Sequence, residues 1–355
     1  MHAIEITGAA RPSTILVGES IEKLGRYLPA GRVVVVTDGN VRQLYQDRFP
    51  PAAPVLSIGG GEAFKTLETA KDLYEALLGL EVDRGTFILG VGGGIVCDVA
   101  GFVASTYMRG LRFGFVATTL LAQVDASVGG KNGVNLEGYK NLVGTFNQPE
   151  FVLCDMRLLQ TLPEAEVVNG MAEIVKHALI ADAGLFAFLE EHAAGALSLD
   201  PPVIERLVRD SVVIKSGVVG RDERETGERR KLNFGHTFGH ALEKVSGLSH
   251  GEAVGVGMAL AASFSVRRGR LAAAAHERVA RLLRSLRLPC AARADAGRVV
   301  DAVLRDKKRD ADRIHFVMLE EIGRAVVEEV PIAELKAAAA AFEDILQPTG
   351  RRDVP

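Results

Sequence analysis

Strand-like and helix-like segments alternate along the first part of the chain, and this alternation limits the possible fold more than any other feature. The β-branched run at residues 33–36 is followed by loop residues, and a helical stretch then covers 66–80. Apolar strand-like runs at 86–89 and 113–119 enclose a helix-like segment at 95–108. Strands that alternate with helices in this way predict an α/β domain with a mainly parallel sheet.

The pattern changes after about residue 155. Helical periodicity dominates residues 163–193, 251–266 and 276–286, and the clearest remaining strand is at 314–319. We therefore predict two domains, an α/β domain over residues 1–155 and an essentially all-α, mostly helical domain over residues 156–355.

Composition excludes several classes of protein. The net charge is −3 and 48% of residues are hydrophobic, so neither nucleic acid nor a membrane surface is an expected partner. The N-terminus lacks the features of a signal peptide, and the apolar run near 257–266 is too short to span a bilayer. Three widely spaced cysteines do not make a disulfide framework. A cytoplasmic protein is expected.

A glycine run, residues 92–94, lies where a strand gives way to a helix. Glycine there allows a phosphate to approach the backbone N–H groups at the helix N-terminus. Ile95 stands where a G-x-G-x-x-G motif would have its third glycine, so a nucleotide site and a simple tight turn both remain open. Asp38, at the end of an early strand, could bind a ribose or cap a helix.

The segment 125–141 has no regular period and is predicted to be a long loop. It combines Asp125, Lys131, Lys140 and Asn141 with four glycines. Ammonium and amide groups donate hydrogen bonds to phosphate or carboxylate, so the segment suits anion binding, although a solvated loop has the same composition.

Histidines and one glutamate predict a metal site. His236 and His240 lie four residues apart, on one face of a helix, and His250 follows within fifteen residues in a chain with only eight histidines. Glu173 precedes them in an apolar helical stretch, which it shares with Lys176. Histidine and carboxylate ligands suit Zn²⁺. Thr237 replaces the glutamate of H-E-x-x-H, which excludes that type of peptidase, but spacing alone does not decide which histidines are ligands.

These motifs, in this order, resemble the 3-dehydroquinate synthase family of the sugar-phosphate cyclase superfamily. The resemblance covers about residues 38–308 and includes GGGIVCDVAGF, TYMRG, TTLLAQVDASVGGK, GYKN, MAEIVKH, DERETGERRKLNFGHTFGH, SHGEAV and DKK. It implies a Rossmann-like N-terminal domain, an α-helical C-terminal domain, bound NAD, a zinc or cobalt ion, and a homodimer.

The resemblance also implies roles for individual residues. The metal ligands would be Glu173, His236 and His250. Positions that match NAD contacts are Asp38, Asn40, Glu62, Lys65, Gly93, Gly94, Asp98, Thr118, Thr119, Leu158, Thr161, Leu162 and Glu166. Positions that match the substrate pocket are Asp125, Lys131, Lys140, Asn141, Lys176, Lys215, Glu225, Arg229, Asn233, His240 and Lys307. Arg109 matches an arginine that reaches the neighbouring subunit's site.

The implied reaction converts 3-deoxy-D-arabino-heptulosonate 7-phosphate to 3-dehydroquinate and phosphate. Two departures from the family pattern, Asn132 in KNGVN and the turn LEGYKN, leave open a related cyclase that makes an amino-dehydroquinate or a valiolone. An NAD- and metal-dependent polyol dehydrogenase is a further alternative, as is a metal-stabilised binding protein. Retention of Lys215, Arg229, Asn233 and His240 favours the substrate that carries a carboxylate.

Overall fold

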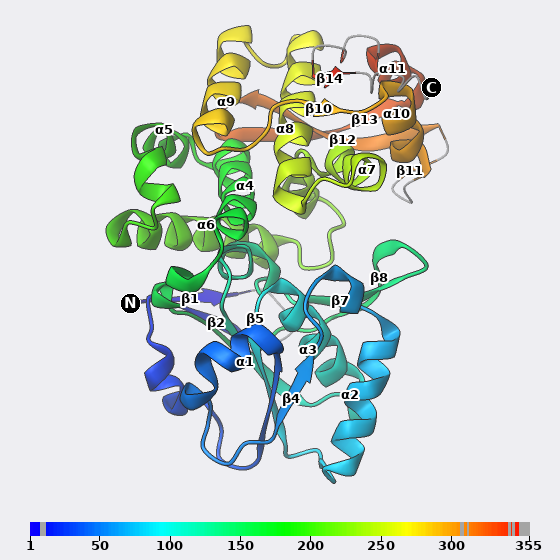
Figure 1. Ribbon diagram of the computed structural model, residues 1–355. Coiled ribbons are helices and arrows are strands. Elements are labelled where there is room, and N and C mark those ends of the chain that lie inside the picture. Colours follow the sequence, from blue (N-terminus) through cyan, green and yellow to red (C-terminus); the bar gives the residue numbers. More distant parts are fainter. Residues whose placement is uncertain (8–11, 306–308, 311, 340–341, 343–344, 348–355) are drawn as a thin grey trace, which may run out of the picture. The chain divides into compact units, whose positions relative to one another are not determined.

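The chain forms two compact units, each built from two separate segments. The computed structural model describes residues 1–7, 12–305, 309–310, 312–339, 342 and 345–347 (Figure 1). Unit 1 consists of Met1–Val167 and Ile204–Arg224, and unit 2 of Val168–Val203 and Glu225–Pro355. Lys307 lies outside the described residues.

Unit 1 is centred on a seven-stranded sheet, which confirms the predicted α/β architecture. Its strands are β1 (His2–Ile6), β2 (Ser13–Val17), β3 (Val33–Asp38), β4 (Val55–Ile58), β5 (Phe87–Gly92), β6 (Arg112–Ala117) and β9 (Phe151–Cys154). They are ordered β1-β2-β9-β6-β5-β3-β4, and all pairs are parallel except β1 with β2. The chain leaves β3 for β4 on one side and returns to β5 on the other, so the order reverses between β3 and β5.

Helices pack on this sheet and bury its apolar side chains. Those of unit 1 are α1 (Gly39–Tyr45), α2 (Leu67–Gly79), α3 (Gly94–Thr106) and most of α6 (Pro201–Arg221). The core includes Leu16, Val35, Leu89, Val116 and Leu153, one from each of five adjacent strands. Burial of each such side chain stabilises the fold by about 1.5–3 kcal/mol.

Residues 131–146 form a hairpin, so the prediction of a long loop over 125–141 was wrong for most of that segment. Strands β7 (Lys131–Leu136) and β8 (Tyr139–Phe146) pair antiparallel. Between them, Glu137 (φ +50°) and Gly138 (φ +75°) make a two-residue turn with both φ angles positive, as in a type I′ turn. Gly133 faces Gly144 across the ladder, and the backbone there is too close for a Cβ. These glycines interrupt the alternation of apolar and polar residues by which a strand is recognised in a sequence. The same glycines allow the two strands to pair closely.

Unit 2 is mostly helical, as predicted. Its helices are α4 (Glu164–Ala181), whose first turn belongs to unit 1, α5 (Ala183–Leu197), α7 (His236–Ser246), α8 (His250–Arg267), α9 (Ala273–Ser285), α10 (Ala296–Arg305) and α11 (Ile332–Ala339). None of the helices within the described ranges is long and apolar enough to cross a bilayer.

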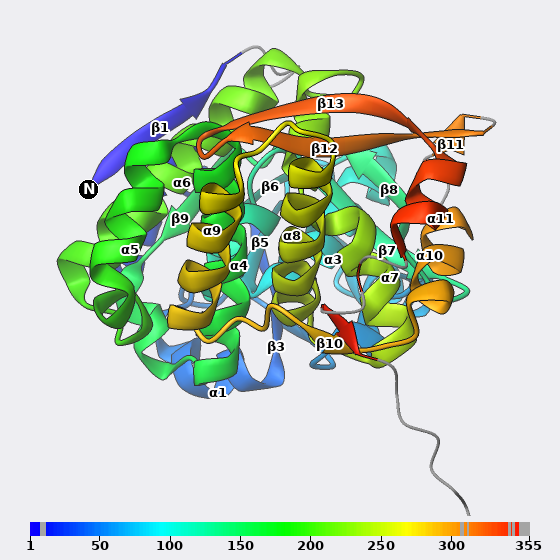
Figure 2. The ribbon, with the colours of Figure 1, turned by 90° about the horizontal axis from the view of Figure 1, so that it is seen from above.

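Unit 2 also contains strands, so its C-terminal part is not purely α. They are β10 (Ala292–Arg293), β11 (Arg309–Asp310), β12 (Arg313–Glu321), β13 (Arg324–Pro331) and β14 (Leu346–Gln347). The strand predicted at 314–319 lies within β12, which pairs antiparallel with β13 and crosses the helical layer that contains α8 and α9 (Figure 2). Phe316 on β12 packs edge-on against Phe238 and Phe264, which anchors the hairpin to α7 and α8.

Candidate metal centre and nucleotide-binding edge

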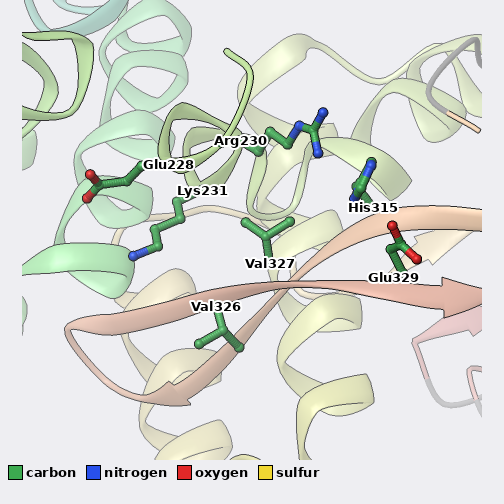
Figure 3. A pocket seen from close by; sticks show the side chains of 8 residues that line it. Glu228, Arg230, Lys231, His315, Val326, Val327 and Glu329 are labelled. Atoms are coloured by element: carbon green, nitrogen blue, oxygen red, sulfur yellow. The ribbon is translucent and has the colours of Figure 1, made fainter. Parts of the chain in front are cut away.

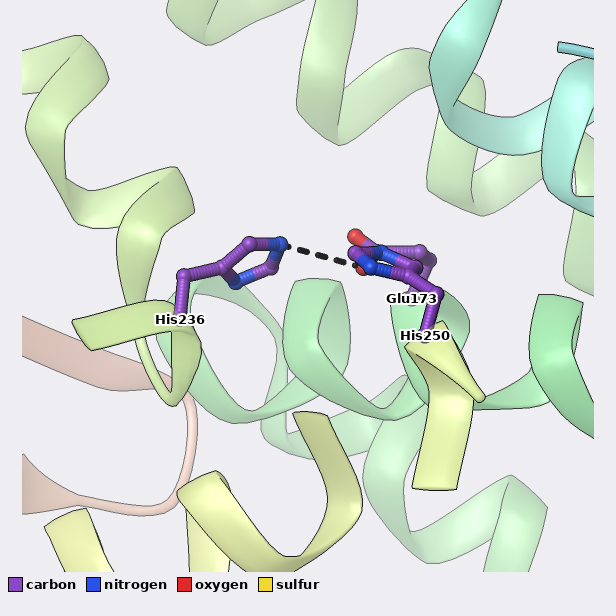
Figure 4. Close-up of side chains that lie close together, drawn as sticks. All are labelled: Glu173, His236 and His250. Carbon is purple, nitrogen blue, oxygen red and sulfur yellow. Dashed lines mark hydrogen bonds and ion pairs between the residues drawn. The ribbon is translucent and has the colours of Figure 1, made fainter. Parts of the chain in front are cut away.

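Three side chains of unit 2 converge from three helices. Glu173 lies in the middle of α4, His236 is the first residue of α7, and His250 is the first residue of α8. The Nε2 atoms of His236 and His250 lie 3.4 Å and 3.3 Å from Glu173 Oε1. Figure 4 shows the His236 imidazole pointing toward the Glu173 carboxylate.

The second nitrogen of each histidine is held by an acceptor. His236 Nδ1 lies 3.2 Å from the carbonyl oxygen of Phe234, and His250 Nδ1 lies 2.8 Å from Glu243 Oε1. A carbonyl and a carboxylate can only accept, so each Nδ1 carries the proton and donates it. With the proton on Nδ1, each Nε2 would carry the lone pair for a bound ion, as in metal sites where an outer carboxylate or carbonyl orients a histidine.

The spacing of these donors fits a divalent cation. Ligand atoms at about 2.0–2.1 Å from a tetrahedral zinc ion lie about 3.4 Å apart, close to the two measured separations. All three ligand atoms lie within 4.8 Å of one another. Two nitrogens and one carboxylate oxygen make a three-ligand set of the catalytic type, which suits zinc or cobalt.

The electrostatics of the set also favour a cation. Glu173 is fully buried, and although burial opposes ionisation, Lys176 and His236 hold its pKa well below the usual range. Burial lowers the pKa of His236. Burial acts in the same direction on His250, but hydrogen bonds to Glu173 and Glu243 raise its pKa to about 9. A proton on His250 and a bound metal ion are alternative ways to neutralise the same buried carboxylates.

Two glycines explain why α7 and α8 bring their first residues together. Gly235, just before His236, has φ +80°, a conformation that glycine adopts without strain. A Cβ on Gly257 of α8 would collide with the carbonyl oxygen of Gly235. Because neither position has a side chain, the start of α7 packs directly on α8.

Unit 1 places a second group of predicted residues along the carboxyl ends of its parallel strands. Asp38 ends β3, Gly93 and Gly94 follow β5, and Thr118 and Thr119 follow β6. The strand order reverses between β3 and β5, and in open α/β sheets such a point is where nucleotides bind. Gly93 is the N-cap of α3 and makes no side-chain capping bond, a position that suits a phosphate.

Other predicted nucleotide contacts have clear structural partners. Asp38 Oδ1 accepts from the backbone N–H of Val41 at 2.9 Å, so it caps α1. The Thr161 and Tyr45 hydroxyls lie 2.6 Å apart. Leu158 is buried, and Asn40 is exposed in α1. The short helix η6 (Met156–Thr161) carries Leu158 and Thr161, with Leu162 as its C-cap, and Glu166 is in the first turn of α4.

A polar network joins the nucleotide edge to the β7–β8 hairpin. Lys65 is only 5% exposed, and its Nζ donates to Asp98 Oδ2 at 2.5 Å and to Asn141 Oδ1 at 2.6 Å. Asn135 Nδ2 donates to Glu62 Oε1 at 2.8 Å. Burial raises the pKa of Asp98 in spite of the adjacent Lys65 ammonium. Three predicted cofactor residues and one predicted substrate residue thus meet in one network.

The remaining predicted residues are placed as follows. In unit 1, Lys215 of α6 donates to the Asp125 carboxylate at 2.7 Å, Lys131 Nζ lies 6.0 Å from the Phe146 ring centroid, Lys140 is exposed, and Arg109 is exposed with φ +67°. In unit 2, Lys176 pairs with Glu173, Asn233 donates to Glu225, Arg229 is buried, and the His240 ring meets the His236 ring edge-on at 5.4 Å.

Sequence reasoning missed Glu243, which orients His250. Glu243 lies seven residues after His236, two helical turns along the same face of α7, and that spacing could have drawn attention to it.

A hollow in unit 2 lies on the β12–β13 hairpin (Figure 3). It has a volume of about 470 Å³ and is lined by Gly227, Glu228, Arg230, Lys231, His315, Val326, Val327 and Glu329. Its charged side chains have both signs, and none of them is a predicted site residue. The short helix η7 (Glu228–Asn233), which carries Arg229 and Asn233, forms one side of it.

Two solved structures with this fold are synthases with NAD⁺ and a metal ion bound. A 2-deoxy-scyllo-inosose synthase complexed with carbaglucose-6-phosphate, NAD⁺ and Co²⁺ is 29% identical, with a TM-score of 0.85 over 95% of this chain and 99% of that one. The 2-epi-5-epi-valiolone synthase from Streptomyces hygroscopicus subsp. jinggangensis, with NAD⁺ and Zn²⁺ bound, is also 29% identical, with a TM-score of 0.86 over 95% and 97%.

Sequence comparison gives the particular family. The 3-dehydroquinate synthase N-terminal model matches residues 55–169, and the C-terminal model matches residues 170–309. A 3-dehydroquinate synthase from Desulforamulus reducens is 39% identical over 95% of this chain and 99% of its own length. The chain belongs to the 3-dehydroquinate synthase family.

Proposed function

We propose that the protein is a 3-dehydroquinate synthase that depends on NAD and a divalent metal. It converts 3-deoxy-D-arabino-heptulosonate 7-phosphate to 3-dehydroquinate and inorganic phosphate, a carbocycle-forming lyase reaction with no net oxidation. The observation that carries the proposal is the convergence of His236 and His250 on Glu173, in a chain 39% identical to a 3-dehydroquinate synthase.

The metal is assigned to Glu173, His236 and His250. Zinc or cobalt supplies a Lewis acid there, which lowers the pKa of a bound hydroxyl. Glu243 and the Phe234 carbonyl keep both histidines in the ligating tautomer. His240 lies one turn beyond His236 and serves to move a proton at a substrate hydroxyl, a role that suits imidazole near neutral pH.

NAD is assigned to the carboxyl edge of the unit 1 sheet. It supplies a hydride acceptor that returns the hydride within the same turnover. In this proposal the pyrophosphate binds at Gly93 and Gly94, at the N-terminus of α3, and Asp38 at the end of β3 binds a ribose. Lys65 and Asp98 fix the loop beside this edge through their ion pair.

The substrate's two anionic groups need cationic partners. In this proposal Arg229 and Lys215 bind the carboxylate, and Lys131, Asn141 and the partner subunit's copy of Arg109 bind the phosphate. Arg229 and Lys215 are both buried, and Lys215 donates to the Asp125 carboxylate. Lys140, Lys176, Glu225 and Asn233 complete the polar set, and the homodimer and a cytoplasmic location belong to the same proposal.

A single incubation tests the proposal. The purified protein is mixed with NAD⁺, Zn²⁺ and the heptulosonate phosphate, and phosphate, dehydroquinate and NADH are followed together. The proposal predicts equal amounts of phosphate and dehydroquinate with no net NADH. Accumulation of NADH would instead point to a polyol dehydrogenase.

A second candidate function is another sugar-phosphate cyclase. The two solved synthases that share the fold at 29% identity favour it, as do the departures at Asn132 and in LEGYKN. Glucose 6-phosphate and sedoheptulose 7-phosphate lack the carboxylate, so turnover of either in place of the heptulosonate would select this candidate.

A further inference from the structure

Asn135 faces an irregularity in the β7–β8 hairpin. Val134 pairs with Val143 and Leu136 pairs with Tyr139, so Asn135 alone stands opposite residues 140–142. The surplus residues form a bulge in β8, and bulges re-aim side chains near functional sites. This bulge presents Lys140 and Asn141, two predicted substrate residues.

The Asn135 side chain bonds in two directions. Its Oδ1 accepts the backbone N–H of Asn141 at 2.9 Å, and its Nδ2 donates to Glu62 Oε1 at 2.8 Å. Its own backbone N–H donates to the Lys65 carbonyl at 2.8 Å. Asn141 has φ +52°, and its Oδ1 accepts from Lys65 Nζ at 2.6 Å.

The chemistry of this position requires an amide. One end of the side chain must accept from a backbone N–H, and the other must donate to a carboxylate. An amide does both, whereas a carboxylate only accepts and an alkyl group does neither. Asn141 has a left-handed conformation, which asparagine adopts more readily than other side-chain-bearing residues, and the hydrogen bond from its N–H to Asn135 holds it there.

We propose that Asn135 is a positioning residue that sets the β8 bulge and links it to the nucleotide edge. Its Oδ1 holds Asn141 in the bulge, and its Nδ2 holds Glu62 beside Lys65. Occupancy of the cofactor edge and the placement of Asn141 are therefore coupled through one side chain. The functional part of this inference rests on the proposed function, because Glu62 and Lys65 match NAD contacts of the family and Asn141 is assigned to the substrate phosphate.

Two substitutions separate the two bonds. Asn135→Ala removes both. Asn135→Asp keeps an acceptor for the Asn141 N–H but places a carboxylate against Glu62, where the like charges repel. Adding Glu62→Gln to Asn135→Asp restores a donor–acceptor pair on that side. Asn147→Ala is the matched control, because Asn147 lies just past the other end of β8 and its Nδ2 donates to Ser105.

The first readout needs no ligand. Hydrogen–deuterium exchange of the peptide that contains Asn141 should be about tenfold faster in Asn135→Ala, which corresponds to about 1.4 kcal/mol and lies within the range for one hydrogen bond. Exchange should be near wild type in Asn135→Asp and in Asn147→Ala. Unchanged exchange in Asn135→Ala would overturn the assignment of the bulge to Asn135, whether or not the protein binds NAD.

The second readout is the affinity for NAD⁺, measured by calorimetry. We expect the dissociation constant to rise about tenfold in Asn135→Ala and at least as much in Asn135→Asp. The double variant Asn135→Asp with Glu62→Gln is followed by thermal denaturation instead, because Glu62 is itself a predicted NAD contact, and it should regain the stability that Asn135→Asp loses. The KM for the heptulosonate phosphate should rise in Asn135→Ala but not in Asn147→Ala. A dissociation constant within twofold of wild type in both single variants would refute the link. Absence of NAD⁺ binding by the wild type would refute the proposed function and leave the exchange result to decide the bulge.

Discussion

The two polar centres of the molecule are held in place by different means. The Glu173 set of unit 2 comes from three helices whose packing fixes each backbone, and Glu173 is fully buried. The Lys65 network of unit 1 joins a 3₁₀ turn, a helix and a strand hairpin, and it is held by hydrogen bonds among them.

The two centres differ in how easily their side chains can move. Side chains that close-packed helices bury are stiff, so we expect the metal ligands to keep their positions before any ion binds. A hairpin with a bulge and a positive-φ turn has fewer buried contacts, and its local stability is lower. We therefore expect the unit 1 network to change its conformation when a ligand binds. We expect the Glu173 set of unit 2 to keep its conformation.

The largest expected effect comes from the metal ligand. Glu173→Ala should abolish metal binding and reduce turnover by well over about 100-fold, more than the loss of an outer-shell partner. Metal content by mass spectrometry and turnover with added Zn²⁺ measure this. Glu277→Ala, on the exposed face of α9, is the control. Full activity in Glu173→Ala would show that this carboxylate is not a ligand.

The outer carboxylate should have a smaller effect. Glu243→Ala frees His250 Nδ1 from its acceptor, and metal affinity should fall about 10–100-fold while the fold is retained. Competition with a chelator measures the affinity. An unchanged affinity would mean that helix packing alone orients His250. The hydrogen bond to Glu243 would then not be needed to hold the imidazole in place.

The ion pair of unit 1 provides a test of the second centre. Lys65→Met leaves Asp98 without its cation and should lower the free energy of unfolding by about 3 kcal/mol. Combining it with Asp98→Asn should recover most of that loss, because no unpaired charge remains. Urea denaturation of the single and double variants measures both. If the double variant were no more stable than Lys65→Met, the pair would not carry the stability of this network.

A substitution in the β7–β8 turn should raise the stability of unit 1, whereas Lys65→Met lowers it. Glu137 has φ +50°, which costs a side-chain-bearing residue about 1 kcal/mol, so Glu137→Gly should stabilise unit 1 by at most that amount. Thermal denaturation measures it, and metal affinity should not change. A loss of stability would show that the Glu137 side chain contributes more than its backbone costs.

The smallest effect concerns a carboxylate outside both centres. Hydrogen bonds from Tyr27, Lys23 and the Ser20 N–H lower the pKa of Glu19 to about 2. The ionised form is favoured in the folded state, so its contribution to stability is complete above pH 4.5 and is lost as the pH falls toward 2. Glu19→Gln should flatten the stability profile in that window. An equally steep profile in the variant would assign the acid sensitivity to other groups.

Much of this molecule could be predicted from regular patterns. The alternation of apolar strands with helices indicated β3, α2, β5, α3 and β6, because buried parallel strands need continuous apolar runs. The histidine spacing indicated that His236 and His240 share a helix face, which the 5.4 Å ring contact confirms. The roles of the individual site residues stay predictions.

Other features had no local signal. The β7–β8 hairpin depends on Gly133 and Gly144 meeting across a ladder, a pairing between residues eleven positions apart that no periodicity reports. The partner strand β13 likewise shows no clean alternation, and it forms because β12 offers it an edge. Glu243 and Asn135 act through partners that only the fold brings near.

Helix α6 has a consequence for how the chain is made. Its residues complete unit 1, yet they are synthesised after the first segment of unit 2, residues 168–203. Near its ends, α6 meets the first residues of the protein: Glu205 pairs with the terminal amine of Met1, and Gly220 packs on the Thr7 carbonyl. A ribosome must therefore extend the chain past residue 224 before β1 can meet α6. A fragment that ends near residue 155 would lack α6, and with it Lys215.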